Sequence, residues 1–227
     1  MIIEQPARFL RWIYPRAIWR IDPSSKAVYL TFDDGPIPEA TPFVLDTLAR
    51  YGVKATFFMV GDNVRKHPDI FRQVVEAGHR IGNHTFNHIG GLRWLSRKYL
   101  KNAQKANEIM RCHLDDLNLA QADGSTSVNR SLTLFRPPHG WMRPLQYMVI
   151  RLQGYRIIMW DLVTRDYSKR LTADDVFENV KRYARNGSII TFHDSLRSID
   201  KLKKILAPSI EWLLNEGYEF RLIPDEP

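Results

Sequence analysis

Strand-like runs alternate with helical patterns from residue 27 to the end of the chain, and this alternation constrains the fold more than any other feature. The strand-like runs, rich in Val, Ile, Tyr and Phe, cover residues 27–32, 55–60, 80–83, 132–136, 155–160, 188–193 and 219–222. Helical patterns lie between them, over residues 42–51, 68–77, 96–112, 144–153, 173–184 and 199–216. Strands and helices that alternate at this spacing predict βα units around a parallel sheet.

A single domain is expected over most of the chain, because 227 residues are typical of one α/β domain and no Gly/Ser linker divides them. We expect residues 26–227 to form this domain and residues 1–25 to be a segment packed against it. The polar stretch 114–131 contains Asp123-Gly124-Ser125 and predicts an exposed loop. The only cysteine, Cys112, rules out an internal disulfide.

Polar side chains follow the predicted strands at the points where the strands end. Asp33 and Asp34 follow the first strand, and His84 and His88 follow the third. The same placement holds later in the chain for Arg136, Asp161, Asp166 and His193. Because the carboxyl ends of barrel strands meet on one face, these groups are expected to surround one pocket.

Two pairs among these residues bear on a metal site. His84 and His88 are four residues apart, so both imidazoles can reach one ion; two histidines on a solvated helix are the alternative. Asp33 and Asp34 are adjacent, so their carboxylates point in different directions. One metal ligand and one base is therefore more natural than two ligands, although an Asp-Gly turn that caps a helix has the same sequence.

Five short motifs resemble those of the polysaccharide deacetylase family, which carries the NodB homology domain and is also called carbohydrate esterase family 4. The resemblance covers roughly residues 26 to 223. The motifs are Thr31-Phe32-Asp33-Asp34-Gly35-Pro36, His84-Thr85-Phe86-Asn87-His88, Arg136-Pro137-Pro138-His139-Gly140, Asp166-Tyr167 and Thr191-Phe192-His193. The resemblance implies a distorted, incompletely closed (β/α) barrel, in agreement with the seven strands expected above.

The resemblance to this family also implies an activity. This activity is the metal-dependent removal of acetyl groups from N-acetylated amino sugars of a polysaccharide or oligosaccharide of the peptidoglycan or chitin type. By the same resemblance, Asp34, His84 and His88 hold one divalent metal ion. Zinc is the usual ion in the family, and cobalt or another divalent ion is an alternative. Imidazole combined with one carboxylate suits metals of this class.

The remaining motif positions imply the acid, the base and the pocket. Asp33 would be the general base, held in place by Arg136, and His193 the general acid, oriented by Asp166. The backbone N–H of His139 would help to stabilise an oxyanion. Three positions depart from the family pattern and bear on the shape of the pocket: Tyr167 stands for Trp, Thr191 for Leu, and His139 where Tyr is frequent.

Two other functions use the same residues or part of them. An O-acetyl esterase acting on acetylated xylan would need the same machinery, and motifs do not separate the two. A catalytically silent carbohydrate-binding protein is less consistent with the sequence, because a binding protein does not need a base and an acid together. Asp161 remains an additional carboxylate without an assigned role, and Trp94 and Trp141 could equally stack on sugars or pack in the core.

The charge and the N-terminus bear on partners and location. The net charge is +8, but no nucleic-acid recognition motif accompanies it, so we expect a solvated basic surface, a carbohydrate substrate bound in an open groove, and a monomer. Residues 1–22 contain no signal-peptide h-region, and no stretch reaches the length of a membrane span. These features favour the cytoplasm, with an association with the cell envelope as the alternative.

Overall fold

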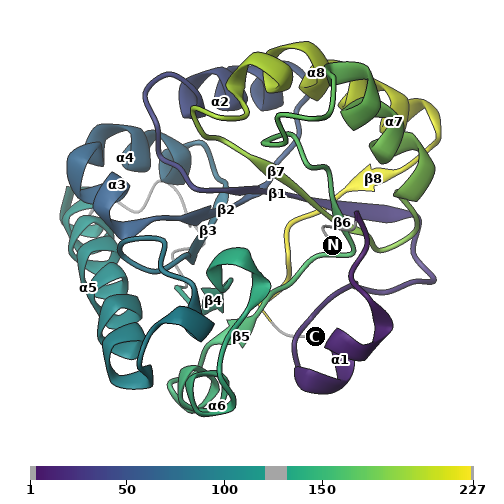
Figure 1. Ribbon diagram of the computed structural model, residues 1–227. Coiled ribbons are helices and arrows are strands. Elements are labelled where there is room, and N and C mark those ends of the chain that lie inside the picture. Colours follow the sequence, from purple (N-terminus) through teal and green to yellow (C-terminus); the bar gives the residue numbers. More distant parts are fainter. Residues whose placement is uncertain (1–3, 121–131, 226–227) are drawn as a thin grey trace.

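The computed structural model describes residues 4–120 and 132–225, which form a curled parallel sheet surrounded by helices (Figure 1). The sheet runs in the order β5-β4-β3-β2-β1-β7-β6, and β8 pairs with β1 beside this path. The strands are β1 (Ala27–Asp33), β2 (Thr56–Met59), β3 (Arg80–Asn83), β4 (Leu134–Phe135), β5 (Arg156–Ile157), β6 (Leu162–Val163), β7 (Ile189–His193) and β8 (Glu219–Phe220). Because β5 and β6 are the two edges, the sheet is an incompletely closed barrel, as predicted.

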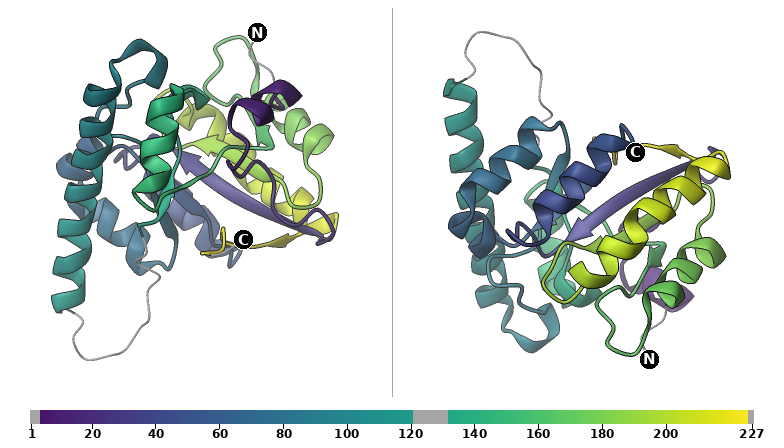
Figure 2. Two further views of the ribbon diagram at one scale, coloured as in Figure 1. Left: turned by 90° about the horizontal axis from the view of Figure 1, so that it is seen from below. Right: turned by 90° about the horizontal axis from the view of Figure 1, so that it is seen from above.

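Helices cover the outer side of this sheet (Figures 1 and 2). The α-helices are α1 (Arg8–Ile13), α2 (Thr41–Arg50), α3 (Gly61–Lys66), α4 (Pro68–Glu76), α5 (Ser96–Ala120), α6 (Pro144–Leu152), α7 (Ala173–Tyr183) and α8 (Ile199–Asn215). Two 3₁₀ turns, η1 (Gly91–Arg93) and η2 (Pro138–Gly140), follow β3 and β4. No helix within the described residues is both long and apolar enough to span a bilayer.

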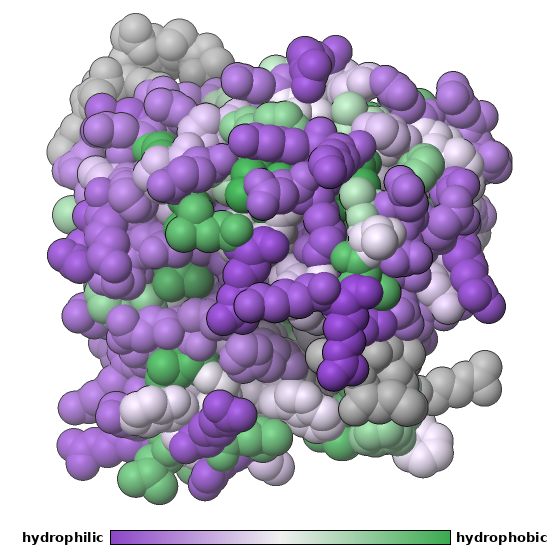
Figure 3. Space-filling model, turned by 45° about the horizontal axis from the view of Figure 1, so that its top comes forward, coloured by the Kyte–Doolittle hydropathy of each residue, from purple (hydrophilic) through white to green (hydrophobic). Residues whose placement is uncertain are grey.

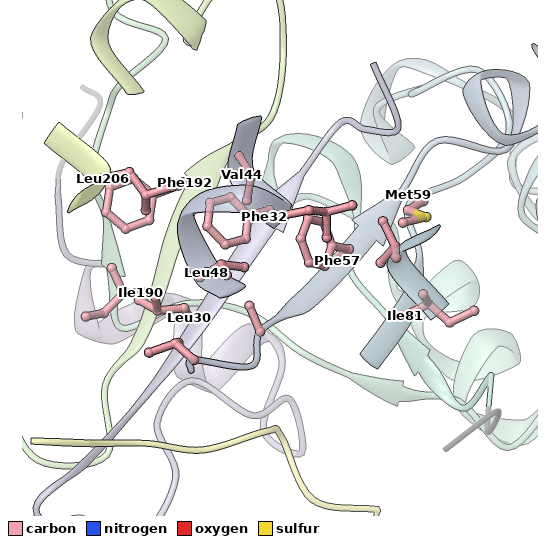
Figure 4. Close-up of a cluster of buried hydrophobic side chains, with 14 of the residues drawn as sticks. Leu30, Phe32, Val44, Leu48, Phe57, Met59, Ile81, Ile190, Phe192 and Leu206 are labelled. Atoms are coloured by element: carbon pink, nitrogen blue, oxygen red, sulfur yellow. The ribbon is translucent and has the colours of Figure 1, made fainter. Parts of the chain in front are cut away.

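The main core lies between the central strands and the helices outside them (Figure 4). All seven residues of β1 are buried, as expected for a parallel strand whose two faces are covered. The rings of Phe57 and Phe192 stack on Phe32 from the two neighbouring strands, with centroids 5.1 and 5.9 Å away. This packing holds β1, β2 and β7 in register and so fixes the positions of the residues at their carboxyl ends.

Helix α5 is longer than the sequence pattern predicts. It was expected to end at residue 112 and continues to Ala120, so the predicted loop over residues 114–131 is wrong for residues 114–120. Met110, Leu114 and Leu117 are buried in the main core at helical spacing, and this packing outweighs the polar character of their neighbours. The rest of the predicted loop, residues 121–131, lies outside the described residues.

The predicted strand over residues 155–160 is shorter, β5 alone, and an additional strand, β6, follows it, which brings the total among the described residues to eight. The pairing with β4 ends at Ile158, whose N–H donates to the carbonyl oxygen of Phe135. The N–H of Asp161 then donates to the carbonyl oxygen of Ile189 in β7, which lies across the gap between the two edges of the sheet. Asp161 therefore precedes a strand rather than following one.

The segment before β1 crosses the opening between the two edges of the sheet. Ile18 pairs in parallel with Ile158, next to β5, and the N–H of Ile21 donates to the carbonyl oxygen of Gly187, next to β7. Further towards the N-terminus, the carbonyl oxygen of Glu4 accepts from the N–H of Val163 in β6. The bond of Glu4 places the start of the segment beside the carboxyl end of β6, and the bond of Ile21 places its end beside the amino end of β7.

Candidate active site

The carboxyl ends of β1, β3 and β7 bring the predicted site residues together. Asp33 at the end of β1 is in register with His193 at the end of β7, and His84 directly follows β3. A cavity of about 750 Å³ opens at this point. Eight of the ten predicted site residues line it: Asp33, Asp34, His84, His88, His139, Tyr167, Thr191 and His193. The other two, Arg136 and Asp166, are buried directly behind this lining.

Asp34, His84 and His88 form a cluster with the geometry of a metal site. Their ligand atoms lie within 4.8 Å of one another. Asp34 Oδ1 is 3.1 Å from His88 Nε2 and 3.8 Å from His84 Nε2. His84 Nδ1 is 2.8 Å from the carbonyl oxygen of Arg136, which leaves Nε2 directed at the cluster. A second hydrogen bond of this kind is the usual way in which a metal-binding imidazole is oriented.

The electrostatics of the cluster agree with a divalent ion. Asp34 Oδ1 is a buried acceptor without a hydrogen-bond partner, an arrangement that is costly unless a cation completes it. Burial opposes ionisation of Asp34, but the neighbouring His88, His193 and His84 outweigh burial and hold its pKa well below the usual range. Burial lowers the pKa of His84 to about 4, so its imidazole is neutral, the form that binds metal. One carboxylate and two imidazoles therefore fit zinc or a similar ion.

We predict that the protein binds up to one divalent ion per chain and that the His84→Ala, His88→Ala double variant weakens zinc binding by more than about 100-fold, because a single carboxylate remains. Calorimetric titration with zinc and elemental analysis after dialysis would measure both. His113→Ala on α5, outside the cavity, is the matched control and should bind like the unaltered chain. Stoichiometric zinc in the double variant would refute the ligand assignment.

Asp33 lies beside the metal cluster and is held by a buried arginine. Arg136 Nη1 donates to Asp33 Oδ1 at 2.6 Å and to Thr31 Oγ1 at 2.8 Å. Nε and Nη2 of the same guanidinium donate to the carbonyl oxygens of Ile158 and Met159. Since Arg136 is fully buried and all three of its guanidinium nitrogens donate hydrogen bonds, it fixes the direction of the Asp33 carboxylate. Asp33 is thus held apart from the cluster of Asp34, His84 and His88.

His193 lies across the cavity and is paired with Asp166. Asp166 Oδ1 is 2.8 Å from His193 Nδ1, and Oδ2 accepts from the His193 backbone N–H at 2.7 Å. Burial disfavours the imidazolium, but the charge and hydrogen bond of Asp166, helped by Asp34 and Asp33, outweigh it and raise the pKa of His193 to about 9. The imidazole is therefore protonated at neutral pH and can act as an acid.

The three positions that depart from the family pattern also line the cavity. The ring of Tyr167 stands edge-on to His193, with centroids 4.8 Å apart, and the ring of His139 stands in the same way to His88, also at 4.8 Å. His139 has a φ of +60°, so η2 turns sharply there. Thr191 Oγ1 is 3.1 Å from Thr31 Oγ1, which places a hydroxyl pair at the base of the site.

The structure places the three residues whose roles the sequence left open. Asp161 is a structural anchor: its carboxylate accepts two hydrogen bonds from Arg185, at 2.8 and 2.5 Å, and one from Ser188 Oγ. Trp141 lines the cavity, whereas the ring of Trp94 is covered by the ammonium group of Lys98, 3.8 Å from its centroid.

Sequence reasoning missed two features of the site. Asp194 is fully buried; its carboxylate accepts from the N–H of Gly35 and from Thr41 Oγ1, and so holds the turn that carries Asp34. A Cβ at residue 35 would lie 2.0 Å from the Asp194 carboxylate, which explains the glycine. The second feature is the N-terminal segment, which forms one wall of the cavity through Gln5, Pro6, Ala7, Phe9 and Leu10. The expected open groove is therefore bounded on that side.

Comparisons with known proteins give the family of the chain. Residues 20–158 match the model of the family described as polysaccharide deacetylase. A peptidoglycan-N-acetylglucosamine deacetylase of Bacillus cereus is 30% identical over 210 residues, which cover 89% of this chain and 88% of the relative. A chitooligosaccharide deacetylase of Sinorhizobium fredii is 34% identical over 185 residues, covering 80% of this chain and 78% of the relative.

Solved structures include a carbohydrate esterase family 4 pseudoenzyme from Bacillus anthracis. It superimposes with a TM-score of 0.78 at 26% identity and covers 92% of this chain and 68% of that one. The fold is therefore shared with proteins of this family whether or not they are active. The family model spans more than half of the chain and the sequence relatives cover most of it, so the chain belongs to the polysaccharide deacetylase family.

Proposed function

We propose that this protein is a metal-dependent hydrolase that removes acetyl groups from N-acetylated amino sugars in a polysaccharide or oligosaccharide of the peptidoglycan or chitin type. One observation carries the proposal. One cavity is lined by three side chains that could hold a divalent ion, by a separate carboxylate, Asp33, and by a separate imidazole, His193, whose pKa is raised to about 9. Metal-dependent amide hydrolysis uses these three elements.

Asp34, His84 and His88 would hold the ion. Once bound, a divalent ion supplies a Lewis acid that stabilises negative charge on an acyl oxygen and makes water a stronger acid. Three protein ligands leave a coordination position open, as in catalytic rather than structural zinc sites.

Asp33 would accept the proton of the attacking water. The position fits this role, because Arg136 holds one carboxylate oxygen at 2.6 Å and Asp33 still lines the cavity. A base fixed in this way loses little orientational freedom when the substrate binds.

His193 would deliver a proton to the departing amine. An amine is a poor leaving group unless it is protonated, so amide cleavage requires such an acid close to the nitrogen. Asp166 keeps the imidazole charged and occupies its Nδ1, so that the proton on Nε2 is available for transfer.

The proposed substrate follows from the relatives named as peptidoglycan and chitooligosaccharide deacetylases. We expect zinc-loaded protein to release acetate from N-acetylglucosamine oligomers or peptidoglycan fragments, and little or none from acetylxylan. An enzymatic acetate assay with equal acetyl concentrations of the three substrates would measure this. Release from acetylxylan alone would replace the proposal with an O-acetyl esterase. Metal binding without release from any of them would make the chain a silent relative, like the pseudoenzyme.

A further inference from the structure

Three segments beside the cavity carry the net charge of the whole molecule. They are residues 5–16, which include α1, residues 89–101, which include η1 and the start of α5, and residues 140–155, which include α6. Together they contain nine Arg and Lys residues and no Asp or Glu. Because the chain has 33 basic and 25 acidic residues, the remainder holds 24 basic and 25 acidic residues, which nearly cancel. We call these three segments the basic face.

The segments are distant in sequence but adjoin in space. The rings of Tyr14 and Tyr147 lie 5.2 Å apart, and the N–H of Arg16 donates to the hydroxyl of Tyr147. These contacts join the α1 segment to α6. Arg143, which precedes α6, donates to the carbonyl oxygen of Leu92 in η1 at 3.0 Å. Figure 1 shows α1 and α6 along the lower edge of the molecule, and the left view of Figure 2 looks onto this side.

The basic face also carries most of the exposed apolar side chains. Among the described residues, ten large apolar side chains are exposed, and eight of them belong to these segments. Trp12, Leu152 and Leu95 are the most exposed, at 83%, 78% and 73%. The eight are Phe9, Trp12, Ile13, Leu92, Leu95, Leu145, Met148 and Leu152. On α1 and α6 they recur at helical spacing, on the sides turned away from the core.

The other side of the molecule differs. Figure 3 brings forward the side that carries α2, α7 and α8, and its surface is mostly hydrophilic, with small apolar patches between polar side chains. Exposed apolar residues that gather on one side of a protein mark an interaction surface, whereas scattered ones are normal. The concentration of both charge and apolar side chains on the basic face therefore indicates one partner that offers both anionic groups and apolar surface.

We propose that the basic face docks on the surface of an anionic lipid bilayer. Trp, Phe and Leu combined with Arg and Lys, and without acidic residues, is the composition of helices that lie in the membrane interface. Nucleic acid would be attracted by the charge, but it offers little to exposed Leu and Met side chains on helix surfaces. A second copy of the chain is opposed by charge, since two basic faces would repel each other.

Docking would bring the cavity towards the membrane surface. Phe9 and Leu10 from one segment of the basic face, and Trp141 from another, also line the cavity. A carbohydrate held close to the lipid headgroups would therefore reach the site without the protein leaving the membrane. The docking itself does not depend on the proposed deacetylase activity, and the binding test below needs no substrate.

The test is sedimentation of the full chain with phospholipid vesicles. Vesicles with roughly one third phosphatidylglycerol in phosphatidylcholine should retain the protein, and vesicles of phosphatidylcholine alone should retain much less, because basic residues are attracted by anionic headgroups. Raising the salt from about 0.05 M to about 0.5 M should weaken binding to the anionic vesicles, since screening shortens the range of the attraction. Equal retention by both kinds of vesicle, or by neither, overturns the proposal.

Two sets of variants locate the surface. Arg16→Gln, Arg93→Gln and Lys101→Gln together remove three exposed charges from the basic face and should lower vesicle partitioning at least about tenfold. Arg72→Gln, Lys203→Gln and Lys204→Gln remove three exposed charges from α4 and α8 and should change it little. Likewise Trp12→Ser with Leu152→Ser should reduce partitioning, and Leu214→Ser on α8 should not.

Other outcomes would assign the face to another partner. All variants must first match the unaltered chain in circular dichroism and thermal midpoint, because the altered side chains are exposed and the fold should not depend on them. A gel shift of short duplex DNA that the charge variants abolish, without vesicle binding, would overturn the proposal in favour of nucleic acid. A dimer in sedimentation velocity that Trp12→Ser with Leu152→Ser dissociates, without vesicle binding, would overturn it in favour of self-association.

Discussion

Asp33→Asn is expected to lower kcat for deacetylation by roughly 10²–10⁴-fold, the usual effect of removing a general base, and to leave the divalent ion bound. Asparagine keeps the size of the side chain and an acceptor for Arg136, which lies 2.6 Å from the carboxylate, but it cannot take a proton. The measurement is acetate release at saturating substrate, with zinc content determined on the same sample.

Asp34→Asn is the informative comparison, because the two carboxylates are adjacent in sequence and differ in their surroundings. Asp34 Oδ1 faces His84 and His88 and has no hydrogen-bond partner, so its loss should weaken zinc binding itself. Excess zinc should then restore part of the activity of Asp34→Asn and none of the activity of Asp33→Asn. If Asp33→Asn lost the ion while Asp34→Asn kept it, the two roles would be exchanged.

The centre of this site was predictable from sequence because its residues sit at strand ends. The strand patterns placed Asp33 and Asp34 directly after the first predicted strand and His193 at the end of the sixth, and the register of β1 with β7 brings these ends together. No long-range information is needed beyond the rule that parallel strands end on one face. The family motifs added the expectation that Asp34, rather than Asp33, is the metal ligand.

The parts that could not be predicted depend on packing between distant segments. Helix α5 extends beyond its apparent end because Leu114 and Leu117 reach the core, and the polar residues around them conceal this. Asp194 directly follows His193 and gives no signal in sequence, yet burial raises its pKa to about 8 and its carboxylate holds the Gly35 turn.

The N-terminal segment illustrates the same limit. Its pattern of Arg and aromatic residues predicts packing against the domain and does not say where. Three separate contacts decide this: Glu4 with Arg165, Arg11 with Asp161, and the Tyr14 hydroxyl with the backbone of Met142. They lie far apart in the chain, and together they turn residues 5–10 into a wall of the cavity.

His193→Gln is expected to cut hydrolysis of an acetamide by roughly 10²–10⁴-fold and that of an activated ester such as 4-nitrophenyl acetate much less. The amine needs a proton to leave, whereas nitrophenolate leaves without one. Glutamine preserves a polar side chain beside Asp166 but carries no transferable proton. Parallel measurements of kcat/KM on an N-acetylglucosamine oligomer and on the ester would separate the two effects, and equal losses on both would mean that His193 is not the acid for the leaving group.

The pH dependence gives an independent check on the same residue. His193 must be protonated to act, so activity is retained below its pKa and falls as the pH rises through it. Because Asp166 outweighs burial and raises that pKa to about 9, the basic limb of kcat/KM should lie well above neutral pH. Asp166→Asn removes the charge that opposes burial, so the basic limb should move to lower pH, and in His193→Gln it should disappear. A basic limb at the same pH in all three proteins would have to arise from another group and would remove His193 from the proton transfer.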